Sequence, residues 1–210
     1  HKQKVEEIIK KRLQLQQLKN VDKLKEFMDR YNKPKQDETI AMCGKYIELP
    51  DAYKSVMEAF IHAGVENDAR VNLKWIQSDK LINDEKIKRA LSDVDGVLLL
   101  PGFGPRGAEG KIKVCEYARV NKIPFLGICL GLQCAVIDFA RNICRLKGAN
   151  STEFEKNTKF PVIDLMESQR SIKAKGGTMR LGAYDCDIKR GTKQFESYNT
   201  TNTSERNRLR

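Results

Sequence analysis

The sequence predicts an α/β fold, a doubly wound and mostly parallel sheet flanked by helices and preceded by linker helices. After Pro34, short apolar runs alternate with amphipathic segments, which is the pattern of repeated strand–helix–strand units. Residues 96–100 (GVLLL) form an unbroken apolar run, as in a central parallel strand that is covered on both faces. Glycine-rich turns at 101–107 and 127–131 follow two predicted strands, at the sheet edge where such folds bind ligands.

Residues 1–37 are mostly polar and charged, with two short apolar stripes at helical spacing. The stripes are Val5, Ile8, Ile9, Leu13 and Leu15, followed by Val21, Leu24, Phe27, Met28 and Tyr31. Neither stripe can form a core alone, and Pro34 ends the second helix. We therefore expect 1–37 to be linker helices that pack on a neighbouring domain, in a fragment of a longer protein. Residues 38–210 are expected to form one C-terminally incomplete domain.

The elements of this domain follow in order along the chain. The predicted strands are 39–43, 71–76, 96–100, 123–126, 162–165 and 182–188, and the predicted helices are 52–63, 86–91, 110–120 and 135–141. For the first of these helices, Asp51 is a candidate N-cap and Gly64 a candidate C-terminal stop. The tail 194–210 is rich in Asn, Thr, Ser and charge, which predicts a loop.

Composition narrows the possible functions. The chain has 210 residues, 40% of them hydrophobic, which is enough for the core of one large domain. No apolar run reaches the roughly 20 residues of a membrane span, and no apolar N-terminal segment signals secretion. The formal charge of +11 comes from scattered Lys and Arg without interleaved aromatic residues. A solvated basic surface is favoured, a nucleotide or phosphate partner stays open, and neither nucleic acid nor a membrane is expected as a partner.

Six cysteines occur, none of them in a CxxC pair, together with only two histidines. This pattern argues against a zinc site and fits a reducing compartment, so we expect a cytoplasmic protein without a bound metal.

The most informative cysteine is Cys129, in the heptapeptide GICLGLQ at 127–133. An apolar run precedes it and an amphipathic stretch follows it, which predicts a strand, a sharp turn and a helix. At a helix N-terminus the dipole favours thiolate over thiol, and the next backbone N–H, from Leu130, can face a developing oxyanion. This is the nucleophile-elbow layout with cysteine in place of serine. The alternative is a buried structural cysteine at a strand end.

Several longer motifs surround this turn. They are GKYIELPDAYKS at 44–55, GFGPRG at 102–107 with EGK at 109–111, PFLGICLGLQ at 124–133, NSTEF at 150–154 and GGTMRLG at 176–182. In this order they resemble the glutamine amidotransferase domain of the CTP synthase family over essentially the whole chain, with 1–37 similar to its interdomain linker. The resemblance implies the flavodoxin-like sheet of class I glutamine amidotransferases.

The resemblance also implies a reaction. The cysteine thiolate attacks the side-chain amide of L-glutamine, ammonia leaves, and water hydrolyses the glutamyl thioester. In the family, ammonia passes to a separate synthetase domain, where ATP and Mg²⁺ serve the amination of UTP to CTP. No cofactor is implied for the present domain, GTP is implied as an allosteric activator, and the full protein is expected to form a homotetramer.

The resemblance assigns catalytic roles to three residues and a shaping role to a fourth. Cys129 matches the nucleophile, and the backbone N–H groups of Gly102 and Leu130 match the oxyanion donors. Phe103 matches a residue that shapes the pocket. The plainer alternatives are a turn glycine at 102 and a core aromatic at 103.

Four further residues match positions that bind ligands in the family. Gln133 and Glu153 match positions that hold the α-amino and amide ends of glutamine, and a carboxylate such as Glu153 suits an ammonium partner. Arg210 stands where an arginine grips the α-carboxylate. Arg106 lies in the lid loop that senses GTP. Each of these four also has the alternative of an ordinary surface, helix-end or terminal residue.

Some of the family pattern is missing. The family takes its base from a His-Pro-Glu segment further along, whereas His1 lies in the linker and His62 at a helix end. We therefore expect these 210 residues alone to be inactive, with the base following Arg210. Pro101 precedes Gly102 where the family has a glycine, which puts the oxyanion loop in question.

Two more departures lie near the end of the chain. Residues 167–176 form a shorter segment than in the family, and Asn207 and Leu209 replace histidines. The alternative functions are a catalytically silent regulatory or assembly module of the same fold, or a γ-glutamyl cysteine hydrolase.

Overall fold

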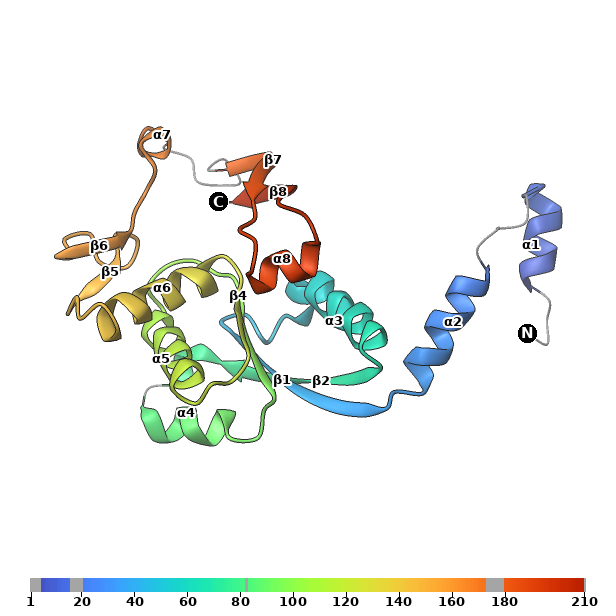
Figure 1. The fold of residues 1–210 in the computed structure, drawn as a ribbon, viewed down its shortest axis with the longest axis horizontal. Helices are drawn as coiled ribbons and strands as arrows, with labels where there is room; N and C mark the ends of the chain where they lie inside the picture. The colour runs from blue at the N-terminus through green and yellow to red at the C-terminus, as the bar shows by residue number, and fades with distance from the viewer. Residues whose placement is uncertain (1–4, 16–20, 82, 173–179, 210) are drawn as a thin grey trace. The chain divides into compact units, whose positions relative to one another are not determined.

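The computed structural model describes residues 5–15, 21–81, 83–172 and 180–209, and the chain divides into two compact units between residues 163 and 164. The first unit contains a four-stranded sheet in the order β2-β1-β3-β4 (Figure 1). Its strands are β1 (Gln36–Gly44), β2 (Ala69–Gln77), β3 (Gly96–Leu99) and β4 (Phe125–Gly127). Every neighbouring pair is parallel. The parallel sheet predicted from the sequence is thus confirmed.

Helices cover both faces of this sheet. They are α3 (Lys54–Glu66), α4 (Asp84–Leu91), α5 (Ala108–Val120) and α6 (Leu130–Asn142), with short 3₁₀ helices at Pro50–Tyr53 and Ser78–Lys80. Ala41 and Cys43 of β1 pack in one core with α4, α5 and α6, whereas Met42 packs in a second core with α3. Successive strand residues point to opposite faces, so an all-apolar strand needs helices on both sides. The doubly wound arrangement is confirmed.

The other strands form two small sheets. In the first unit, β5 (Ala149–Ser151) pairs with β6 (Phe160–Ile163) in parallel. The second unit contains α7 (Glu167–Arg170), β7 (Arg180–Asp187), α8 (Lys193–Tyr198) and β8 (Asn202–Leu209), and its two strands form an antiparallel ribbon. None of the described helices is long and apolar enough to cross a membrane.

The two helices expected in 1–37 are present as α1 (Val5–Leu13) and α2 (Val21–Asn32). Their role as a linker stays a prediction. The end of α2 is tied to the turn between α3 and β2. Arg30 Nε and Lys35 Nζ lie 3.0 Å and 2.6 Å from the Asp68 carboxylate. The ring of Phe27 lies 5.4 Å from that of His62.

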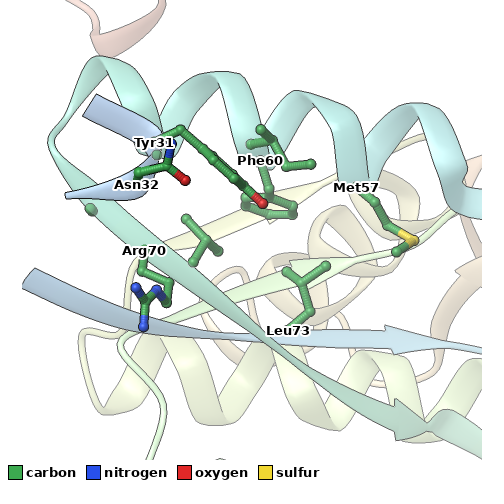
Figure 2. A pocket seen from close by; sticks show the side chains of 10 residues that line it. Tyr31, Asn32, Met57, Phe60, Arg70 and Leu73 are labelled. Carbon is green, nitrogen blue, oxygen red and sulfur yellow. The ribbon is translucent and has the colours of Figure 1, made fainter. Parts of the chain in front are cut away.

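A cavity of about 310 Å³ lies between the end of α2, α3 and β2 (Figure 2). Its lining includes Tyr31, Asn32, Met57, Phe60, Arg70 and Leu73. Among the residues that the structure describes, none that is predicted to bind glutamine lines this cavity.

Both predicted boundaries of the first domain helix were wrong. Asp51 lies inside the 3₁₀ helix that starts at Pro50, and α3 begins only at Lys54. Gly64 is not the stop, because α3 continues to Glu66. A Cβ on Gly64 would lie 2.6 Å from the Ala69 carbonyl oxygen, so this glycine permits the close approach of α3 to β2.

The tail predicted as a loop contains α8 and β8, so this prediction was also wrong. The Thr192 hydroxyl caps α8 by accepting the Phe195 N–H at 3.2 Å. The register of β8 pairs polar residues with β7, for example Asp185 with Ser204. A polar ribbon shows no alternation of apolar and polar residues, which is why its strand was missed.

Candidate active site

Cys129 lies at the turn between β4 and α6, where the sequence predicted it. It is the N-cap of α6, and its φ of 54° and ψ of −109° are rarely adopted by a residue with a side chain. The Gln133 N–H donates to the Cys129 carbonyl at 3.2 Å, so the helix begins directly after the turn. The strained turn places a half-buried thiol at the carboxyl edge of the sheet, as in a nucleophile elbow.

The glycines on either side of Cys129 allow this turn to form. A Cβ on Gly127 would lie 2.5 Å from the Leu132 nitrogen, and a Cβ on Gly131 would lie 2.3 Å from the Leu99 carbonyl oxygen. The first turn of α6 therefore packs directly on the backbone of β3 and β4. This close packing leaves no room for a side chain at either position.

The glycine-rich loop 101–107 follows β3 and lies beside the elbow. Gly102 is buried, and a Cβ built on it would lie 3.5 Å from Leu130 Cδ2. The two residues predicted as oxyanion donors are thus neighbours. Upstream of Pro101, the Leu100 N–H still donates to the Cys43 carbonyl at 2.9 Å, so the loop begins from a regular strand end. The donor roles themselves stay predictions.

Two buried lysines contact the backbone of this loop and of the strand before it. Lys111 is 0% exposed, and its Nζ donates to the Leu100 carbonyl at 2.5 Å. Lys45 is 4% exposed, and its Nζ donates to the carbonyls of Phe103 at 2.5 Å and Gly104 at 2.7 Å. Burial lowers the pKa of both ammonium groups, that of Lys111 to about 8.

The sequence interpretation missed both lysines. A signal for Lys111 was present, because it shares one helical stripe with three buried residues, Val114, Cys115 and Ala118. A lysine at a core position of an amphipathic helix is rarely an ordinary surface residue. Lys45 gives a weaker signal, since only its place directly after a strand sets it apart.

The pKa of the Cys129 thiol is not lowered, although the thiol lies at the N-terminus of α6. Burial raises its pKa, and the carboxylate of Glu153 raises it further. The hydrogen bond from the Leu130 N–H and the charge of Lys111 lower the pKa, but they do not compensate for desolvation. The thiol therefore needs a base to react at neutral pH, as was expected from the sequence for this family.

The structure brings most of the other predicted site residues to the same edge. Glu153 Oε1 accepts the Gly104 N–H at 2.8 Å, which ties the segment after β5 to the loop. Gln133 lies half-buried in the first turn of α6, and the Phe103 side chain is 40% exposed. Arg106 Nε lies 3.4 Å from the Asp79 carboxylate. The ligand roles assigned to these side chains remain predictions.

Other predicted features lie outside the described residues or elsewhere in the fold. Arg210 and residues 173–179, which carry part of the GGTMRLG motif, lie outside the described residues. His62 lies on α3 against Phe27, and no histidine is among the described groups that shift the pKa of Cys129. Within the described ranges, no group of three His, Cys, Asp or Glu side chains is arranged to hold a metal ion.

Comparison with known proteins agrees with this geometry. Residues 48–208 match the protein family Glutamine amidotransferase class-I. The CTP synthase of Christiangramia forsetii is 52% identical over 191 residues, which cover 91% of this chain and 35% of that protein. The CTP synthase of Chloroherpeton thalassium is 48% identical over 214 residues, covering 100% of this chain and 38% of that protein.

A solved structure is also similar. It is the glutaminase domain of Trypanosoma brucei CTPS with bound acivicin, with a TM-score of 0.74 and 32% identity, and the match covers 82% of this chain and 67% of that one. The present chain spans little more than a third of the length of the curated relatives described above. The chain therefore belongs to the CTP synthase family and carries its class I glutamine amidotransferase domain.

Proposed function

We propose that this chain is the glutaminase part of a CTP synthase and hydrolyses L-glutamine through a thioester at Cys129. The observation that carries the proposal is the convergence at one sheet edge of a strained cysteine, the neighbouring residues Gly102 and Leu130, and the carboxylate of Glu153. The solved relative supports it, because acivicin is a glutamine analogue.

In the proposed reaction the Cys129 sulfur attacks the side-chain amide carbon of glutamine. The negative charge that develops on the amide oxygen is received by the N–H groups of Gly102 and Leu130. The carbon–nitrogen bond breaks after the nitrogen gains the proton that the Cys129 thiol lost to the base, and ammonia leaves. Water then attacks the thioester, the carbon–sulfur bond breaks, and glutamate and the free thiol are released.

Recognition of glutamine is proposed to depend on charge at its amino-acid end. The Glu153 carboxylate pairs with the α-ammonium, and Arg210 with the α-carboxylate. Gln133 holds the substrate from the first turn of α6, and Phe103 closes the pocket from the loop. Arg106, in the same loop, is proposed to sense GTP.

The longer protein is proposed to use the ammonia. Because the pKa of Cys129 is raised, glutamine hydrolysis requires a base, and we propose that the longer protein supplies it. Ammonia then serves the ATP- and Mg²⁺-dependent amination of UTP to CTP in a synthetase part, with GTP as activator. A homotetramer in the cytoplasm is the proposed assembly and location.

A chloroketone analogue of L-glutamine tests the site directly. A thiolate displaces its chloride without needing a base, so at pH 9.5 we expect it to modify Cys129 in this chain. L-Glutamine at millimolar concentration should slow the modification, and D-glutamine should not. Modification confined to the exposed Cys144, or modification of Cys129 without protection by L-glutamine, would contradict the proposal.

A second experiment tests the role within the longer enzyme. Cys129→Ala should abolish CTP formation from glutamine and leave CTP formation from ammonium salts within about twofold, because only the nucleophile is removed. Equal use of glutamine by the variant and the wild type would exclude Cys129 as the nucleophile.

A further inference from the structure

The middle of the loop 101–107 is held by hydrogen bonds to its backbone, at Phe103 and Gly104. The Phe103 side chain is 40% exposed, and a Cβ at Gly104 would meet no atom within 4 Å. The Gly104 φ of 71° and the Gly107 φ of 69° show that the loop path is itself unusual for residues with side chains. Packing around Gly104 therefore does not explain the position of this part of the loop beside Cys129.

Lys45 supplies two of the contacts that fix the loop. It follows the last residue of β1 at the carboxyl edge of the sheet, and its buried Nζ donates to two successive carbonyls, those of Phe103 and Gly104. On the other side, the Gly104 N–H donates to Glu153. The Gly104 residue is thus held by a cation at its carbonyl and by an anion at its N–H, and both contacts are charge-assisted.

The surrounding charges act on Lys45 in opposite directions, and burial lowers its pKa more than any single one of them shifts it. The carboxylates of Asp79 and Glu153 attract its ammonium group, whereas Arg106 repels it. The aliphatic stem also supports the loop, since Lys45 Cδ would lie 3.7 Å from a Cβ built on Gly102. The same side chain therefore lies beside Gly102 and bonds to Phe103 and Gly104.

We propose that Lys45 is a positioning residue for glutamine hydrolysis, which holds the loop so that the Gly102 N–H and the Phe103 ring face glutamine at Cys129. The inference rests on the proposed function. Without the ammonium group, two inward-facing carbonyls lose their donor and the loop has to rearrange to satisfy them. The oxyanion donor then moves away from the thiol, although no atom of Lys45 takes part in the reaction.

Amide hydrogen exchange in the intact chain measures the positioning without any substrate. In Lys45→Met, we expect the Gly104 N–H to exchange at least about tenfold faster than in the wild type, because the loop opens locally. The matched control is Lys113→Met, which removes an equal charge from the ion pair with Asp84 on the protein surface. Exchange at Gly104 within threefold of the wild type would overturn the inference.

Reactivity of Cys129 at pH 9.5 supplies the functional measurement. For Lys45→Met we expect the chloroketone analogue of glutamine to react about 10–100-fold more slowly, since misplacement of a positioning loop costs that much. Iodoacetamide, which needs no oxyanion loop, should react within about threefold of the wild type. If Cys129 of the wild type does not react with the chloroketone, the proposed function is refuted. If variant and wild type react with it at equal rates, only the role of Lys45 is refuted.

The buried thiols of Cys43, Cys115 and Cys134 report folding in the same experiment, because they should stay unmodified in a folded chain. If Lys45→Met exposes them, Lys45→Gln is measured instead, because its side chain retains an N–H donor. We expect its exchange and chloroketone rates to lie between those of the wild type and those of a chain whose loop is fully released. Unfolding of both variants would count against a positioning role, because Lys45 would then serve core stability.

Discussion

Glu153 accepts a hydrogen bond from the Gly104 N–H at 2.8 Å, although 49 residues separate the two in sequence. The carboxylate proposed to bind the α-ammonium of glutamine is therefore already attached to the loop that carries Gly102 and Phe103. A carboxylate can accept several hydrogen bonds at once, so it can keep Gly104 while it receives an ammonium group. Substrate recognition and loop position thus share one side chain.

Glu153 also influences the nucleophile, because its charge raises the pKa of Cys129. In Glu153→Gln that negative charge is absent, so we expect the Cys129 pKa to fall. The rate of iodoacetamide modification, followed against pH, should show its midpoint at lower pH than in the wild type. Glu155→Gln is the matched control, since Glu155 accepts a hydrogen bond from Asn150 and is not among the groups that shift Cys129. An unchanged midpoint in Glu153→Gln would contradict this electrostatic link.

Backbone strain at Cys129 predicts an unusual order of stabilities. Its φ of 54° and ψ of −109° suit glycine, and a non-glycine residue there costs about 1–3 kcal/mol. Cys129→Gly should therefore be more stable than Cys129→Ala by about 1 kcal/mol, despite the greater flexibility of unfolded glycine. Urea unfolding of the two variants measures this difference. A more stable alanine variant would mean that the turn is not strained.

The close packing at Gly131 predicts that adding a single methyl group there causes a large loss of stability. A methyl group there would lie 2.3 Å from the Leu99 carbonyl oxygen, so α6 would have to move away from β3. We expect Gly131→Ala to lower the free energy of unfolding by about 2 kcal/mol or more. Gly148→Ala is the control, because its φ is 82° but no atom lies within 4 Å of the added Cβ. In Gly148→Ala only the backbone strain, about 1 kcal/mol, should be lost from the free energy of unfolding. Equal losses of stability in the two variants would contradict close packing at Gly131.

The burial of Lys111 predicts that the stability of the folded chain depends on pH. Its pKa is lowered by burial from 10.5 to about 8, so between these pH values the unfolded chain binds the proton and the folded chain does not. The Lys111 contribution to stability therefore rises with pH across this window, and its full destabilising effect is present below pH 8.

Comparison with Lys111→Met isolates this contribution. From pH 7.5 to pH 10, the wild type should gain about 1–3 kcal/mol in free energy of unfolding relative to the variant. Urea unfolding at several pH values measures the difference, and the other titrating groups are common to both proteins. Parallel pH curves for the two proteins would show that Lys111 keeps its proton throughout.

Local sequence patterns were sufficient for the central fold and for the elbow. The apolar run 96–100 predicted a central strand covered on both faces, and all four residues of β3 are buried. Gly127 and Gly131 around Cys129 marked a turn too tight for side chains, and the structure shows the close contacts that require them. These features depend on neighbouring residues, so a single chain segment contains the whole signal.

Tertiary structure decided the features that depend on distant residues. β8 is a strand because β7 pairs with it, and its polar side chains carry no signal of that pairing. The raised pKa of Cys129 results from burial and from Glu153, which outweigh the hydrogen bond from the Leu130 N–H and the charge of Lys111. Lys45, Gly104 and Glu153 come from three separate segments and meet only when the sheet forms. Sequence alone determined where the thiol stands, whereas the charges and hydrogen bonds around it arise from long-range folding, because electrostatic and packing energies depend on distance in space.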